Sequence, residues 1–241
     1  MNSACPYCFT RLGREEVVYR CTSGRCQPVP DPQATALAGY EVATTRMYRQ
    51  VLSETVKTLP ADLPCGLCGG TCTQEVCPAC HRDLPEQWRN RRVFTMAMAG
   101  ARGSGKSVYI AVAVETLIRY AQARGRTVGP ETTGTQEVYA SRYYKPLYRE
   151  NKVVEGTPPI AAGGAYQRDP LIWSVVGGPE RLSIVMRDLS GEDVEKLAGV
   201  RQDFSFIDRA DLVVFLFDPL MLESVRQILA GVIPDVDAHR L

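Results

Sequence analysis

The chain has 241 residues, of which 45% are hydrophobic and 23% charged, an ordinary globular composition that excludes wholesale disorder. Its formal net charge is +1, from 28 Lys+Arg and 27 Asp+Glu, so it lacks the basic excess of a general polyanion-binding protein. The sequence has no signal-peptide pattern and no apolar run of the ~18 residues that a membrane span needs. We therefore expect a cytoplasmic protein that does not bind membranes.

All nine cysteines lie within the first 80 residues. Three C-x-x-C pairs and a looser fourth pair have the spacing of metal-binding turns. Because disulfides do not persist in a reducing cytosol, this pattern favours metal sites over a disulfide framework or a redox pair. We assign two zinc ions, one to Cys5, Cys8, Cys21 and Cys26, and the other to Cys65, Cys68, Cys77 and Cys80. The spacing also allows pairings across these two groups, and Cys72 and His81 are left over.

Four cysteines close the coordination sphere of zinc, so both sites are expected to be structural. Residues 1–92 carry 11 Lys+Arg and 9 Asp+Glu, and eight thiolates with two Zn²⁺ bring the charge to about −2. This charge favours protein interaction over nucleic-acid binding. We expect residues 1–81 to form a zinc-ribbon module that unfolds without Cys65 or Cys77 and leaves the following domain folded.

A helical insertion is predicted at about residues 31–59, between the cysteine groups. Asp31 followed by Pro32 is typical of a helix start, and Pro60 follows the pattern. The apolar or small residues at helical spacing are Leu37, Tyr40, Met47, Val51, Thr55 and Leu59. Residues 82–92 are predicted to be a linker in which Arg89, Arg91 and Arg92 are solvated.

The second part of the chain, residues 93–241, begins with an apolar run of strand length, a G-x-x-x-x-G-K-[ST] motif and a helical pattern. This order directs backbone N–H groups and the helix dipole toward a phosphate group. Lys106 is expected to contact β- and γ-phosphates, and Ser107 to coordinate Mg²⁺. The residues of the loop are Gly100, Ala101, Arg102, Gly103, Ser104, Gly105, Lys106 and Ser107.

Two apolar runs, 171–176 and 181–188, flank Gly177-Gly178 and predict a β-hairpin that ends in a D-x-x-G motif at Asp188. A further strand-like run ends at Asp218. A P-loop ATPase would use Asp218 for its metal, but Pro219 stands where such an ATPase commonly carries a glutamate.

With these segments, residues 93–230 resemble the Ras-like, translation-factor class of P-loop GTPases. A zinc ribbon followed by GARGSGKS and DLSGED resembles, more narrowly, the double-GTPase family of actinobacterial gene neighbourhoods. The resemblance implies that Asp188 holds Mg²⁺, that the Gly191 N–H contacts the γ-phosphate, and that Glu192 replaces a water-orienting glutamine. The switch threonine is assigned to Thr157, and the competing positions are Thr132, Thr133 and Thr135.

The resemblance implies an α/β P-loop NTPase sheet and a GTP- and Mg²⁺-dependent switch with weak hydrolysis. Lys106, Glu192 and Thr157 would be catalytic, and a protein partner would bind the zinc module or the switch loops. The alternatives are an ATPase that uses Asp218 and a nucleotide-binding scaffold without hydrolysis. The base-specificity motif N/T-K-x-D is absent after Asp218, so we expect a C-terminally incomplete sheet, in a truncated chain or with a site completed elsewhere.

Overall fold

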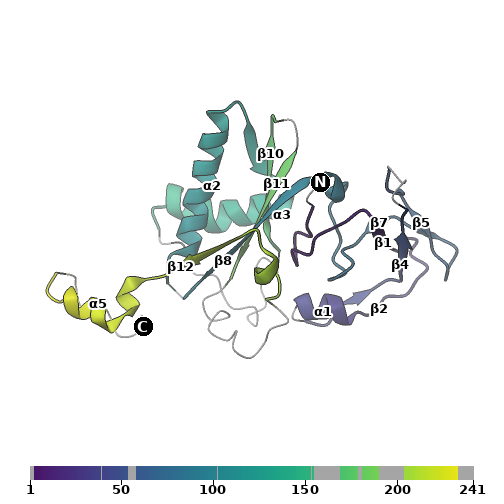
Figure 1. Cartoon of the computed structure of the whole chain (residues 1–241), viewed down its shortest axis with the longest axis horizontal. Coiled ribbons are helices and arrows are strands. Elements are labelled where there is room, and N and C mark those ends of the chain that lie inside the picture. Colours follow the sequence, from purple (N-terminus) through teal and green to yellow (C-terminus); the bar gives the residue numbers. More distant parts are fainter. Residues whose placement is uncertain are drawn as a thin grey trace.

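The computed structural model describes residues 3–38, 40–53, 58–101, 103–152, 154, 169–178, 181–189 and 204–232. These residues form a mixed α/β structure with two four-cysteine clusters near the N-terminus. Figure 1 shows a central sheet with helices on one side and the cysteine-rich part on the other. None of the helices in the described ranges has the length and apolar character required to cross a membrane.

As described by the structure, the central sheet has five strands in the order β12-β8-β11-β10-β9. Their bounds are β8 Arg92–Gly100, β9 Thr127–Pro130, β10 Leu171–Val176, β11 Leu182–Asp188 and β12 Leu212–Leu216. β8 runs parallel to both β11 and β12, whereas β10 is antiparallel to β11 and β9. The predicted hairpin is therefore confirmed, and its second strand lies beside the strand that leads into the glycine-rich loop.

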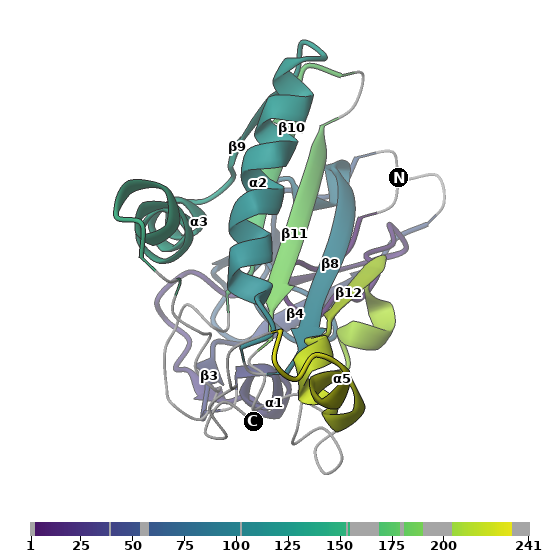
Figure 2. The same cartoon turned by 90° about the vertical axis from the view of Figure 1, so that its left-hand side faces the viewer.

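Helices cover one face of this sheet, as Figure 2 shows. They are α2 (Lys106–Gln122), α3 (Thr133–Val138) and the π-helical segment η2 (Tyr139–Arg149). Because successive residues on a strand face opposite sides, Met98 and Met186 pack on this face with Ile110 of α2. Tyr139 contacts Trp173 edge to face, with ring centroids 4.9 Å apart.

The cysteine-rich part covers the opposite face of the sheet, and the two share one hydrophobic core. The Trp88 side chain is fully buried there, and its indole N–H donates to the Ala4 carbonyl (2.7 Å). Other members of this core are Phe9, Val93, Ala97, Val185 and Phe206. The two parts therefore pack against each other, and independent folding of residues 1–81 stays a prediction.

Two arginines of the predicted linker are buried, so the expectation that they are solvated is wrong. Arg89 pairs with Glu75 and donates to the Gly13 carbonyl, and Arg91 pairs with Glu131 beside β9. Arg92, by contrast, is exposed as expected. Buried guanidinium groups need carboxylate partners, and these two arginines find theirs in the cysteine-rich part and beside the sheet. The segment of residues 82–92 therefore belongs to the contact between the two parts. It includes the short 3-10 helix η1 (Trp88–Asn90).

Within the described part of residues 31–59, the predicted helix forms at its start alone, as α1 (Pro32–Ala38), where Asp31 Oδ1 accepts from the Ala34 N–H (3.0 Å). Strands β3 (Ala43–Thr44) and β4 (Met47–Val51) follow. β4 pairs antiparallel with β1 (Glu16–Arg20), and β-branched residues in this region favour the strand conformation. Thr55 lies outside the described residues. The remaining short strands are β2 (Val29–Pro30), β5 (Leu63–Pro64), β6 (Thr71–Cys72) and β7 (Gln74–Glu75).

β12 is an edge strand of the sheet as far as the structure describes it. Phe215 on this strand is 63% exposed. The 3-10 helix η5 (Ile207–Arg209) precedes β12, and η6 (Pro219–Met221) and α5 (Glu223–Ile228) follow it. Figure 1 shows α5 extending away from the sheet.

Candidate functional site

The eight predicted zinc ligands form two clusters, but their pairing differs from the assignment made from the sequence. Each half of the cysteine-rich part gives one pair of cysteines to each cluster. The first cluster is Cys5, Cys8, Cys77 and Cys80, and the second is Cys21, Cys26, Cys65 and Cys68. The sequential pairing is wrong because β7, which lies just before Cys77, pairs with β1 and so brings the two halves side by side.

Three of the cysteine pairs lie in turns with the same backbone geometry. In the turn from Cys5, the Phe9 N–H donates to the Cys5 carbonyl (3.0 Å), and the turns from Cys65 and Cys77 have the equivalent bond. The residue that donates this bond is in the left-handed region in each turn, namely Phe9 (φ 58°), Gly69 (φ 66°) and His81 (φ 56°). Glycine adopts this left-handed conformation at little cost, which suits Gly69 to its position.

The sulfur positions of both clusters fit a zinc ion. In the first cluster, the Sγ atoms of Cys5 and Cys80 are 3.7 Å apart, and those of Cys8 and Cys77 are 3.6 Å apart. In the second cluster the corresponding separations are also 3.7 and 3.6 Å. Tetrahedral zinc with Zn–S bonds of about 2.3 Å places its sulfur ligands about 3.8 Å apart. Four sulfur ligands would leave no position for a substrate on a zinc ion, which is typical of structural sites.

The two clusters differ in their surroundings. The first is buried against the sheet, where Arg187 Nη1 donates to the carbonyl of Tyr7, between Cys5 and Cys8. Burial lowers the pKa of Arg187 to about 10, although the neighbouring thiols of Cys80, Cys8 and Cys5 act in the opposite direction. In the second cluster, the Cys65 thiol shares a hydrogen bond with Tyr48 Oη, which lowers the pKa of this thiol to about 5.

Sequence reasoning missed Arg187, although an arginine inside the apolar run 181–188 was a signal for it. His81 is not a cluster ligand, and its Nδ1 instead contacts Asp31 Oδ2 (2.9 Å). Cys72 is buried beside the second cluster but outside it, and burial raises the pKa of its thiol to about 12.

The glycine-rich loop has the backbone that its sequence predicts. A Cβ atom on Gly100 would lie 2.2 Å from the Leu216 carbonyl oxygen, and Gly103 and Gly105 have φ values of 76° and 87°. Glycine is therefore required at Gly100 by close approach and favoured at the other two positions by conformation. The Lys106 side chain is buried and lies along the loop, where Nζ donates to the carbonyls of Gly100 and Ala101 (2.8 Å each).

The structure brings Ser107 and Asp188 together, as the strand order predicts. Ser107 Oγ lies 3.5 Å from Asp188 Oδ2, at the adjacent ends of α2 and β11. Asp218 has another role, because its Oδ1 accepts from the Leu220 N–H (2.9 Å) and caps η6. The remaining predicted positions, Arg102, Thr157, Gly191 and Glu192, lie outside the described residues.

The competing threonines belong to α3. Thr132 caps this helix by accepting from the Thr135 N–H (3.0 Å), and Thr133 is its first residue. Thr135 Oγ1 accepts from the Ile172 N–H (2.9 Å) and so ties α3 to β10.

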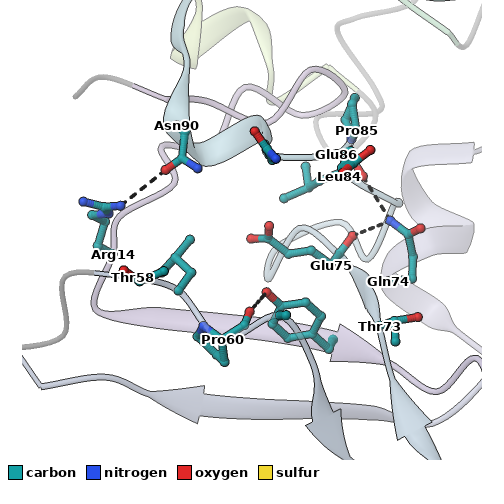
Figure 3. Close-up of a pocket in the computed structure, with 14 residues that line it drawn as sticks. Arg14, Thr58, Pro60, Thr73, Gln74, Glu75, Leu84, Pro85, Glu86 and Asn90 are labelled. Carbon is teal, nitrogen blue, oxygen red and sulfur yellow. Dashed lines mark hydrogen bonds between the residues drawn. The ribbon is translucent and has the colours of Figure 1, made fainter.

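A pocket of about 780 Å³ lies in the cysteine-rich part, and Figure 3 shows its polar lining. Several of the residues that line the pocket form hydrogen bonds with one another. Gln74 Nε2 donates to the Leu84 carbonyl (3.0 Å), and Arg14 donates to Asn90 Oδ1 (3.3 Å). None of the predicted zinc ligands or glycine-rich loop residues lines this pocket, so it is separate from both features.

The chain is 33% identical over 246 residues to a protein of Mycolicibacterium smegmatis named "Putative ESX-1 scaffolding and assembly protein SaeC". The match covers 96% of this chain and 61% of SaeC, so the chain spans less than two thirds of that relative's length. No known protein family and no solved structure matches the chain.

These comparisons correct the functional interpretation made from the sequence. Assignment to the Ras-like or double-GTPase families is wrong, because the relative is named as a scaffolding and assembly protein and no GTPase family matches. The GTP-dependent switch inferred from that resemblance is wrong with it. An eight-residue loop motif establishes local geometry, whereas function depends on a complete site.

We predict that pairs of serine substitutions will reveal the interleaved zinc pairing. Cys5→Ser/Cys77→Ser should remove ligands from the first cluster alone and leave one zinc ion per chain. Cys5→Ser/Cys21→Ser should damage both clusters and leave close to none. Elemental analysis of protein purified without chelators measures this difference. The sequential pairing would give the opposite pattern, with one ion retained in Cys5→Ser/Cys21→Ser, and that result would refute the interleaved clusters.

Proposed function

We propose that this chain is a scaffolding protein that holds protein partners together during assembly of an ESX-type system. The observation that carries the proposal is the 33% identity to SaeC, which extends over 96% of the chain. Because the match includes both the cysteine-rich part and the sheet, the proposal concerns the two as one unit. The protein partners are inferred to be components of such an assembly.

The geometry supports a scaffolding role in two ways. Both clusters use all four zinc positions for cysteine sulfur, which suits a site that stabilises a surface. The cysteine-rich part and the sheet also share a core, so their relative orientation is fixed by packing. A scaffold requires such a fixed arrangement, because partners bound at different places must be held at a set distance.

The test replaces the matching region of SaeC, 61% of that protein, by this chain and keeps the rest of SaeC unchanged. We expect the chimera to support ESX-1 assembly in Mycolicibacterium smegmatis, and a chimera with Cys5→Ser/Cys77→Ser to fail because the shared core loses its zinc. Co-purification of ESX-1 components measures assembly, and the second-cluster chimera Cys21→Ser/Cys65→Ser is the matched control. A stable unsubstituted chimera that recovers no ESX-1 components would contradict the proposal.

We also propose that the glycine-rich loop binds a phosphate group, a role that is separate from any guanine recognition or hydrolysis. Three glycines free the backbone N–H groups to approach an anion, and α2 begins directly behind them. Lys106 already lies along the loop, where its charge would meet the phosphate. Ser107 and Asp188 would supply oxygen ligands to a Mg²⁺ ion that accompanies it.

Lys106→Ala is predicted to weaken binding of inorganic tripolyphosphate by about tenfold or more, because a charge-assisted hydrogen bond is lost. Isothermal titration calorimetry with and without Mg²⁺ measures the affinity, and the thermal midpoint reports whether the fold is intact. Arg119→Ala is the control, since Arg119 is an exposed cation near the far end of α2. Equal affinity of Lys106→Ala and the unsubstituted protein would rule out this role for the loop.

A further inference from the structure

Arg187 on β11 is a buried cation that the proposed scaffolding role does not use. Arg187 is 6% exposed, and its guanidinium carbon lies 3.8 Å from the centroid of the Phe206 ring. Within the described residues, no carboxylate forms an ion pair with it. A buried charge without a carboxylate partner requires another source of negative charge.

The first cysteine cluster supplies that negative charge when it holds zinc. Four thiolates and one Zn²⁺ carry a net charge of −2, and Cys5 and Cys8 are 0% and 3% exposed. Arg187 contacts the turn that carries two of these cysteines, because its Nη1 donates to the carbonyl of Tyr7, which lies between Cys5 and Cys8 in the sequence. A negative centre that is removed from water is costly unless a cation lies close to it.

Two other arginines lie near the first cluster, but neither matches Arg187. Arg82 stacks on the Tyr7 ring with its guanidinium carbon 4.4 Å from the centroid, and it pairs with the exposed Asp169. Arg209 is exposed and donates to the Cys8 carbonyl at 3.5 Å. Arg187 therefore combines burial, contact with the cysteine turn and the absence of a carboxylate partner in the described structure.

We propose that Arg187 is the counter-ion of the first zinc site and a positioning residue that raises its affinity for zinc. The arginine acts from outside the coordination sphere, by offsetting the charge of the four thiolates where they are buried against the sheet. Because neighbouring residues on a strand face opposite sides, Asp188 emerges from the same strand end toward Ser107. The end of β11 thus directs Arg187 toward the first cysteine cluster on one face of the sheet and Asp188 toward Ser107, next to the glycine-rich loop, on the other.

The experiment measures zinc release from the full chain into excess chelator with a chromogenic indicator. The protein with Cys5→Ser/Cys77→Ser retains the second site alone and identifies its release phase. Arg187→Met should release zinc from the first site about tenfold faster or more, as expected for loss of an outer-sphere partner. The second site should keep its rate, and Arg82→Met should leave both rates near those of the unsubstituted protein.

Arg187→Lys separates charge from packing, because lysine keeps the charge and methionine keeps much of the apolar volume. The counter-ion role predicts slower release from Arg187→Lys than from Arg187→Met. A role in packing alone predicts the reverse order and would overturn the proposal, as would release from Arg187→Met at the unsubstituted rate. Arg187→Gln replaces the methionine variant if that protein is insoluble, and the same comparison with Arg187→Lys applies.

Discussion

The contact between the first cysteine cluster and the sheet is the interaction on which the rest of the structure depends. Helices cover one face of the sheet, and without the cysteine-rich part Val93, Ala97 and Val185 would face water on the other. The cysteine-rich part is small, and the core around its first cluster is one that it shares with the sheet. A zinc ion at the first cluster would fix the backbone that supplies Phe9 to this core, and the metal and the sheet would then stabilise each other.

Polar contacts orient the two parts where apolar packing alone would allow them to slide. Asp211, which precedes β12, accepts from the backbone N–H and hydroxyl of Thr95 (2.9 Å each) and pairs with Arg11. Burial tends to raise the pKa of Asp211, but these hydrogen bonds and the Arg11 charge lower it overall, so the carboxylate is charged at neutral pH. A fixed orientation of this kind supports the proposed scaffolding role.

Local signals predicted much of this structure, and long-range contacts account for most of what they missed. The glycine-rich loop, helix α2 and the β10–β11 hairpin depend on short patterns, and all three form where the sequence places them. The cysteine pairing depends on the contact of β7 with β1, which spacing cannot reveal. β4 pairs with the same strand β1, and it forms where local periodicity favours a helix. Arg89, Arg91 and Arg187 looked like ordinary charged residues because their burial depends on partners far along the chain.

The most direct test of this account is amide hydrogen exchange of the sheet after zinc is lost from one cluster at a time. Loss from the first cluster, in Cys5→Ser/Cys77→Ser, should remove much of the protection of β8 and β11, because their shared core is exposed. Loss from the second cluster, in Cys21→Ser/Cys65→Ser, should leave those strands protected, since its own core lies apart from the sheet. Unchanged protection of β8 and β11 in protein that has lost its first zinc ion would contradict the account.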